Sequence, residues 1–68
     1  MNASEKRKVL KLYTWSRMGE RDIVARSLCT LIRSARTHRS IMALRAQADM
    51  LEVDTHPDYL DLLASMGV

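Results

Sequence analysis

Residues able to bind a metal ion or to attack a substrate are few in this chain. It has one cysteine, Cys29, and two histidines, His38 and His56. A structural zinc site needs four such ligands, usually in closely spaced pairs, and these three side chains do not have that spacing. Cys29 follows Leu28 with no motif around it, which favours a half-buried small side chain over a reactive thiol. We therefore expect no metal ion and no cofactor.

One cluster of titratable residues comes near the C-terminus, where Asp54, His56 and Asp58 stand close together. A histidine beside carboxylates could act as a general acid or base. Thr55 and Pro57 explain the same stretch as the capped start of a helix. The chain has no nucleophile paired with a base and no glycine-rich phosphate loop. The sequence therefore predicts a protein that is not an enzyme.

His38 is in phase with the apolar positions Leu28, Leu31 and Ala35 of a predicted helix. A pH-sensitive or ligand-binding role can be imagined there. A lone histidine in a helix seam is more often hydrogen-bonded and structural, and we expect that role for His38.

The basic residues change type along the chain. Every lysine stands at or before Lys11, and every later basic residue is an arginine. Arginine presents a planar fork that suits carboxylates and phosphates, and it is enriched at protein interfaces where lysine is depleted. Steps of seven and three residues put several arginines on one helical face, and we predict an anion-binding surface, the arginine ridge, made of Arg26, Arg33, Arg36 and Arg39. The alternative is a solvated face paired with acidic residues of the same or a neighbouring chain.

The few aromatic side chains stand near charged ones. Tyr13 and Trp15 lie in the basic first part of the chain, and Tyr59 lies in the acidic last part. Aromatic residues near arginine are typical of interaction hot spots, although in a small protein they also fill the core. We predict that Tyr13 and Trp15 anchor the partner of the arginine ridge, and that Tyr59 belongs to a second, acidic contact surface.

Positive and negative charges are segregated along the chain. Residues 1–45 carry eleven positive and three negative charges, a net +8, whereas residues 46–68 carry five negative charges and no positive one, a net −5. The two parts together give the net charge of +3. A basic region of this kind attracts an acidic protein or a nucleic acid, and the acidic end either covers it or offers a second contact surface.

The length of 68 residues fits one small domain, residues 1–68. Such a domain buries only about 60% of its unfolded surface, so it usually needs a disulfide, a metal ion or a partner. A lone cysteine forms no intrachain disulfide and favours a reducing compartment. No apolar run reaches the roughly 18 residues of a membrane span, and the N-terminus does not look like a secretory signal. We expect a cytoplasmic protein that associates with itself.

Helix signals predict an all-α protein, a helical hairpin with one long central helix and a short C-terminal helix. The first helix spans 3–18, with Asn2 as its N-cap and a glutamate three residues later in the capping-box position, and Gly19 ends it. Residues 20–52 contain no glycine or proline, and apolar residues recur there at three- and four-residue steps, which predicts one continuous helix. A last helix spans 57–66.

A helix over 20–52 is about 50 Å long, and the first helix covers only about 24 Å of it. If the remaining apolar stripe stayed exposed to water, the fold would lose roughly 1.5–3 kcal/mol of stability for each large side chain. A homodimeric bundle buries the stripe, and we predict that its seam consists of Leu28, Leu31, Ala35, Ile41, Met42, Leu44 and Leu51. The alternative is a break near Thr37, since Ser, Thr and His replace good helix formers at 34–40. That break would give three or four short helices folded as a compact monomer.

A set of residues within 4–44 follows an ordered pattern, namely Val9, Leu10, Leu12, Gly19, Val24, Ala25, Leu28, His38 and Arg39. The pattern resembles the LuxR-type helix-turn-helix domain, in which a Val-Leu-x-Leu helix, a glycine and an Ile-Ala-x-x-Leu helix precede a recognition helix with His-Arg. The chain departs from it by one extra residue before Val24, and by Thr30, Leu31 and Ile32 in the stretch that leads into the family's turn. The resemblance implies DNA contacts by Arg33, Arg36 and Arg39, whereas the missing turn argues against a separate recognition helix.

The chain also resembles in kind the short helical antiactivators and inhibitors that bacteriophages and plasmids encode. The shared features are the length, the all-helical pattern, an Arg-Thr-His-Arg segment before an Ala- and Leu-rich stretch, and the lack of catalytic residues. This likeness implies function by occlusion, in which a small protein covers a surface that its target needs. We predict a regulatory protein–protein interaction module, an inhibitor or adaptor that binds a host regulator or other target protein. The alternative is a small DNA-binding transcriptional regulator.

Overall fold

The computed structural model describes residues 1–67 and contains four helices. They are α1 (Ala3–Arg17), α2 (Arg21–Ser34), α3 (His38–Met50) and α4 (Pro57–Ser65). No strand occurs in this part of the chain, which confirms the predicted all-α class. None of the helices described has both the length and the apolar character that crossing a membrane requires.

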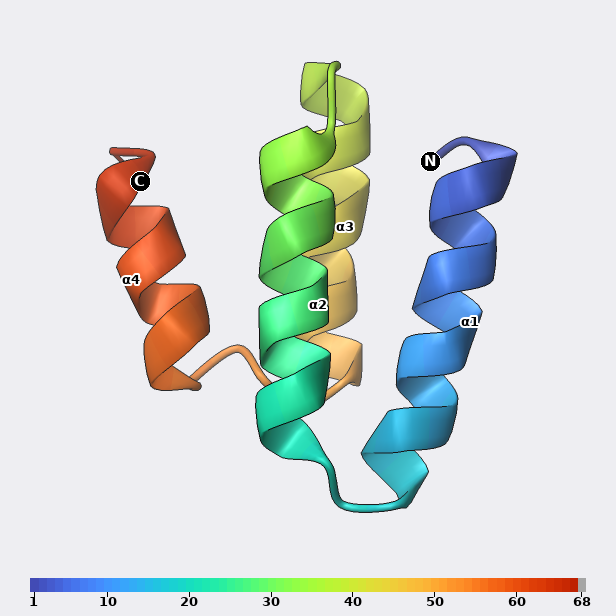
Figure 1. The fold of residues 1–68 in the computed structure, drawn as a ribbon. Coiled ribbons are helices and arrows are strands. Elements are labelled where there is room, and N and C mark those ends of the chain that lie inside the picture. Colours follow the sequence, from blue (N-terminus) through green and yellow to red (C-terminus); the bar gives the residue numbers. More distant parts are fainter. Residues whose placement is uncertain (68) are drawn as a thin grey trace.

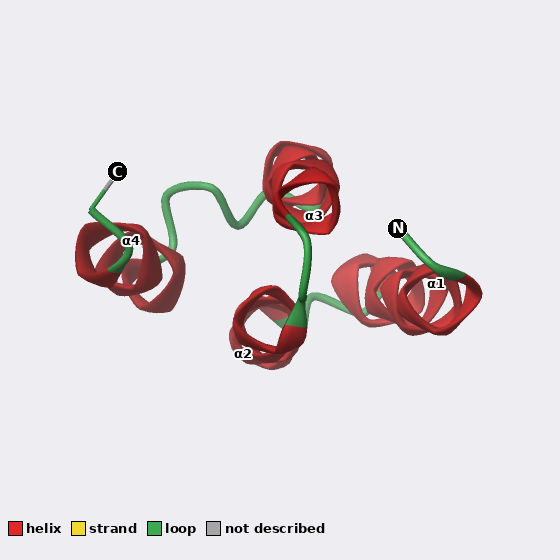
Figure 2. Ribbon diagram, turned by 90° about the horizontal axis from the view of Figure 1, so that it is seen from above, coloured by secondary structure: helices red, strands yellow, loops and turns green. Residues whose placement is uncertain are grey.

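Three of the helices lie in one row, and the fourth covers one side of it. In Figure 1, α4, α2 and α1 stand next to one another, and α3 lies behind α2. The view from above places α3 on one side of the row and none of the four helices on the other side (Figure 2). The helix α2 packs against all three of the others, so it is the centre of the fold.

The core is built around α2. Its residues Val24, Ala25 and Leu28 have no exposed surface, and Ile32 is only 2% exposed. Leu44 of α3 belongs to the same cluster and is also fully buried. Burial of a large apolar side chain stabilises a fold by roughly 1.5–3 kcal/mol relative to exposure. A single chain therefore buries most of the apolar stripe that the sequence displays.

The predicted single helix over 20–52 is wrong, because the chain leaves the helical conformation at 35–37. Ala35 has extended backbone angles (φ −66°, ψ 136°), and so does Thr37 (φ −122°, ψ 149°). The hydroxyl of Thr37 accepts the backbone N–H of Ser40 at 3.1 Å and caps α3. Serine and threonine favour such caps over helix interiors, because their side chains compete for backbone groups. The chain adopts the alternative, the break near Thr37.

The predicted dimer seam is also wrong, because the break folds α3 back against α2. The largest members of the seam lie in the core of one chain and are 0–7% exposed, namely Leu28, Leu31, Leu44 and Leu51. Ala35 and Ile41 are partly buried against the same core, and Met42 is 45% exposed on α3. A side chain that is buried within its own chain cannot form the contact between two chains.

Both ends of α1 lie where the local sequence predicts them. Asn2 Oδ1 accepts the Glu5 backbone N–H at 2.8 Å, and Glu5 Oε1 accepts the Asn2 backbone N–H at 2.9 Å, which confirms the capping box. The chain turns at Gly19, whose φ of +80° is strained for any residue with a side chain. The observed helix agrees with the predicted span to within one residue.

The last helix starts at Pro57 as predicted, but its N-cap is not Thr55. His56 occupies the cap position, and its Nδ1 accepts the Asp58 backbone N–H at 3.1 Å. Pro57 fits the first turn, where the N–H that proline lacks would have no partner within the helix.

We expect Leu28→Ala to lower the free energy of unfolding by about 2–5 kcal/mol, because it opens a cavity at the centre of the core. The same substitution at Leu10, which is 66% exposed on α1, should change that free energy by less than about 0.5 kcal/mol. Urea denaturation followed by circular dichroism measures both values. Equal effects at the two positions would contradict a core centred on α2.

Candidate functional site

Of the three aromatic residues predicted to contact a partner, Trp15 is the most exposed. It is 39% exposed on α1. Tyr59 is 4% exposed within the core. Tyr13 is half-buried against the core, and its hydroxyl donates to Gln47 Oε1 of α3. The two tyrosines therefore hold helices together, whereas the tryptophan is available as an aromatic anchor.

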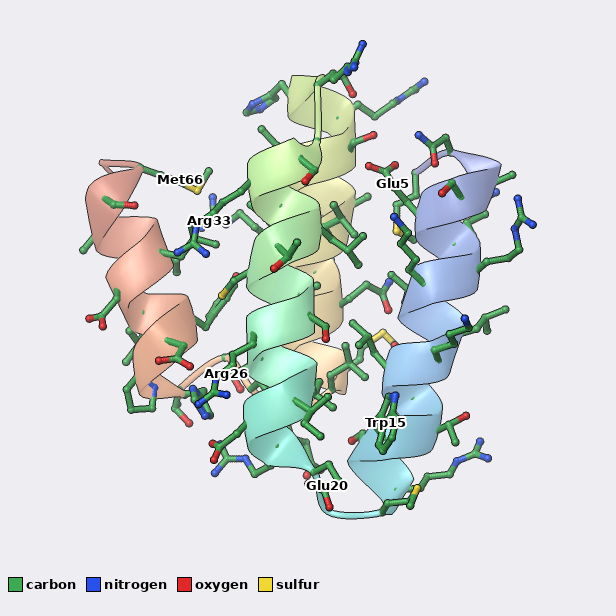
Figure 3. All side chains as sticks on the ribbon, viewed as in Figure 1. Glu5, Trp15, Glu20, Arg26, Arg33 and Met66 are labelled. Carbon is green, nitrogen blue, oxygen red and sulfur yellow. The ribbon has the colours of Figure 1, made fainter. Side chains whose placement is uncertain are left out.

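The arginine ridge does not form one surface. Arg26 and Arg33 project from α2 on the side of α4 (Figure 3), whereas Arg36 lies in the turn after α2 and Arg39 in the first turn of α3. All four side chains are exposed. The predicted steps of seven and three residues needed a continuous helix, which the break at 35–37 removes. The prediction of one arginine ridge is therefore wrong, and the four arginines form two separate pairs.

The acidic end of the chain meets the first of these pairs. Arg26 Nε lies 3.7 Å from Asp58 Oδ2 of α4, and the two side chains are 75% and 44% exposed. An exposed ion pair of this kind stabilises the fold by only about 0–1 kcal/mol. The ion pair matters more for the local potential than for stability. A carboxylate next to Arg26 reduces the positive potential that a partner would meet. Arg26 therefore pairs with an acidic residue of its own chain, which is the alternative to an anion-binding role.

The exposed charges of α1 are all positive. We call its five exposed cations the basic surface of α1, and they are Lys6, Arg7, Lys8, Lys11 and Arg17. The one acidic residue of the helix, Glu5, is only 9% exposed. Its Oε1 accepts the Asn2 backbone N–H and, at 3.2 Å, the hydroxyl of Ser40 on α3. The carboxylate is engaged with the fold and does not offset the basic surface.

An open groove lies between α1 and α2, beside the basic surface. Its cavity volume is about 360 Å³. The helix α1 contributes Lys8, Lys11, Leu12 and Trp15, and α2 contributes Ser27, Thr30, Leu31 and Ser34. A smaller hollow continues along α1 over Ser4, Arg7, Lys8 and Lys11.

The groove combines three kinds of chemistry. Its α1 wall holds two ammonium groups and the indole of Trp15, which Figure 3 shows on the side of α1 that faces α2. Its α2 wall holds three hydroxyls at three- and four-residue steps, and its floor consists of Leu12 and Leu31, which are 3% and 7% exposed. Sites with apolar surface and a few placed polar groups are typical of ligand binding. This one suits an anionic ligand that also has apolar groups.

Reasoning from the sequence missed the lysines of this groove, because it favoured arginine as the anion-binding residue. A signal for them exists in the spacing: Ser4, Lys8, Lys11 and Trp15 follow steps of four, three and four residues, which is one helical face. The sequence does not show which helix lies beside that face.

His56 joins the start of α4 to the start of α2. The residue is 8% exposed, and its Nε2 lies 2.7 Å from Asp22 Oδ1. Because Nδ1 accepts the Asp58 backbone N–H, the neutral ring carries its proton on Nε2 and donates it to the Asp22 carboxylate. Both ring nitrogens are engaged in the fold, so neither is placed to act as a general base.

The other two residues with reactive side chains stand apart from each other. His38 begins α3 and is exposed, so the prediction of a seam histidine is wrong together with the seam. Cys29 is 3% exposed, its Sγ donates to the Asp58 carbonyl at 3.6 Å, and burial raises the pKa of its thiol. Within residues 1–67, no three His, Cys, Asp or Glu side chains come together in a way that could hold a metal ion.

Comparison with known proteins reveals no relative of this chain. No protein-family model matches it, and neither the curated proteins nor the solved structures include a significant match. The likenesses to LuxR-type domains and to phage- and plasmid-encoded inhibitors therefore rest on sequence features alone.

The hydrogen bond with His56 lowers the pKa of Asp22, and the charges of Arg26 and Arg21 act in the same direction against the desolvation that raises it. Since this pKa is lower in the folded state, the carboxylate stabilises the fold above the unfolded pKa of about 3.9 and loses that effect as the pH falls through the folded value. We expect Asp22→Asn to lower the free energy of unfolding at about pH 6, with a difference that shrinks as the pH falls through the lowered pKa of the folded state.

Urea denaturation over this pH range provides the measurement, with Asp61→Asn on the exposed side of α4 as the control. A difference between Asp22→Asn and the native protein that does not change with pH would contradict the role of this carboxylate.

Proposed function

We propose that the protein is a small regulatory interaction module, an inhibitor or adaptor, that binds an acidic segment of a target protein. The groove between α1 and α2 forms its binding site, with Lys8 and Lys11 as the two cations of the basic surface that line it. The observation that carries this proposal is the sign of the exposed charge on α1: five cations are exposed, and the one carboxylate of the helix is buried. Such a field attracts acidic partners and speeds their association.

The chemistry of the groove supports a protein target over a nucleic acid. The exposed part of Trp15 gains stability when apolar side chains cover it, and a phosphate backbone offers none. The five carboxylates after Arg45 also oppose a long polyanion that would extend beyond α1. An amphipathic helix with acidic residues beside an apolar face meets both requirements, and binding of such a helix in a groove is a recurring mode of recognition.

Occlusion is the mechanism that this site favours. A target segment that lies in the groove is covered by α1 and α2 and is lost to its other partners. The protein needs no chemistry of its own for this effect. The likeness to phage- and plasmid-encoded inhibitors supports the same role, and the single cysteine, buried as a thiol, agrees with action in the cytoplasm.

The fluorescence of Trp15, the one tryptophan of the chain, reports on occupancy of the groove. We expect a synthetic amphipathic helix with leucines on one face and aspartates beside them to shift this emission. We also expect Lys8→Glu/Lys11→Glu to raise the Kd of this peptide at least about tenfold, because the change reverses the charge of the α1 wall.

The matched control is Lys6→Glu/Arg17→Glu, which makes the same charge change on α1 outside the groove. It should raise the Kd by less than about threefold, since exposed charges at longer range are screened. An unchanged emission in the native protein, or an equal loss of binding in the two variants, would contradict the site.

DNA binding is the second candidate function, and the break at 35–37 favours it. The resemblance to LuxR-type domains lacked a turn, and the chain has one, with Arg36 in the turn and Arg39 at the start of α3. The arrangement of the two helices counts against this function. In Figures 1 and 2, α2 and α3 run alongside each other, whereas the helices of a helix-turn-helix meet at about 90–120°.

Retention of mixed-sequence duplex DNA at two salt concentrations separates the two functions. We expect weak binding at about 50 mM salt that disappears by about 200 mM, as for non-specific phosphate contacts. Strong retention that falls in Arg36→Ala/Arg39→Ala but not in Lys8→Glu/Lys11→Glu would favour the DNA-binding function instead.

A further inference from the structure

The acidic end of the molecule has the chemistry that the groove accepts. The helix α4 and the link before it carry Asp54, Asp58 and Asp61, and no basic residue follows Arg45. Asp54 and Asp61 are exposed, and Asp58 is partly exposed beside Arg26. The charges of α4 are therefore all negative, whereas the exposed charges of α1 are all positive.

The outward face of α4 also offers an apolar side chain. Tyr59 and Leu62 are buried against the rest of the fold. Because Tyr59 and Leu62 face the fold, helical periodicity places Leu60 and Asp61 on the opposite, solvent-facing side of α4, and Leu60 is 49% exposed. A leucine next to an aspartate on one exposed helical face is a small version of the acidic amphipathic helix that suits the groove.

This helix cannot reach the groove of its own chain. In Figure 1, α4 and α1 lie on opposite sides of α2. Two contacts hold this end of the chain to the start of α2: His56 bonds to Asp22 at 2.7 Å, and Arg21 Nη2 donates to the Glu52 carbonyl at 3.1 Å. A second copy of the chain can present its α4 with no change of fold.

We propose that the α1–α2 groove of one copy receives α4 of a second copy. Charge supports this pairing, because the ammonium groups of Lys8 and Lys11 meet the carboxylates of Asp54 and Asp61. Leu60 then lies over the apolar floor of the groove, beside Trp15. The contact needs only the groove and α4, so it does not rest on the proposed target.

The lengths of the two elements agree. The helix α4 has nine residues, which makes it about 13 Å long. The walls of the groove run over residues 8–15 of α1 and 27–34 of α2, about 12 Å on each side. Because α3 covers the other side of the row, the docked helix lies on the side that Figure 2 leaves open.

This contact is heterologous, because it joins two different surfaces of the same protein. After one such contact the first copy still has an exposed α4 and the second an open groove, so the association either continues head to tail or closes into a ring. It also regulates the proposed function, since an acidic target segment must compete with α4 for the groove.

Sedimentation equilibrium of the native protein is the first test. The average mass should rise at least about twofold between roughly 10 µM and 1 mM at about 20 mM salt, and it should return to the monomer value at about 500 mM salt, where screening removes such contacts. Native protein that stays monomeric at low salt over this range would overturn the proposal.

A reciprocal charge exchange is the second test. Lys8→Glu/Lys11→Glu makes the groove acidic, and Asp54→Lys/Asp61→Lys makes α4 basic, while Asp58 keeps its contact with Arg26. Each variant alone should be monomeric, because groove and helix then have the same sign. An equal mixture should associate again, since the acidic groove fits the basic helix and the native groove fits the native helix.

Failure of the mixture to associate, or association of either variant alone, would contradict the contact. Circular dichroism of each variant establishes that the helices are intact, and Lys6→Glu/Arg17→Glu should associate like the native protein. The Asp54→Lys/Asp61→Lys variant retains the native groove. If it binds the synthetic acidic helix while the native protein does not self-associate, then this inference fails and the proposed function stands.

Discussion

The burial of α2 by three other helices is the interaction on which the rest of the structure depends. The row of α4, α2 and α1, with α3 on one side, lets one chain of 68 residues enclose the fully buried side chains of α2. That enclosure is possible because the chain breaks at 35–37 and α3 turns back. A small domain that buries its apolar stripe in this way needs no second chain for its core, in contrast to the usual requirement at this size.

The same arrangement decides where the charges act. The helix α4 lies along α2, so the carboxylate of Asp58 meets Arg26 and reduces the positive potential on that side. The helix α1 lies on the other side of α2, and the capping box and Ser40 engage its one carboxylate. The segregation of charge along the sequence thus becomes a separation in space. The groove between α1 and α2 is basic because the acidic helix is fastened at the opposite edge.

Signals that act over a few residues allowed accurate predictions. The capping box, Gly19 and Pro57 locate the ends of α1 and the start of α4, since each depends on backbone chemistry within one turn. The break at 35–37 has no glycine or proline to mark it, and a cap by Thr37 competes there with a helix that the apolar periodicity favours. The dimer seam and the arginine ridge followed from the continuous helix, and both fail with it. The groove could not be predicted from the sequence, because its two walls belong to helices whose packing depends on that same break.

Small-angle X-ray scattering at high salt tests most directly whether α3 folds back on α2 within one chain. If α3 packs against α2 within one chain, the particle is compact, with a radius of gyration near the 10.9 Å of the Cα atoms and extents near 30 × 27 × 15 Å, enlarged only by side chains and hydration. A rod-like scattering profile with a maximum dimension of about 50 Å, the length of a continuous helix over 20–52, would contradict it.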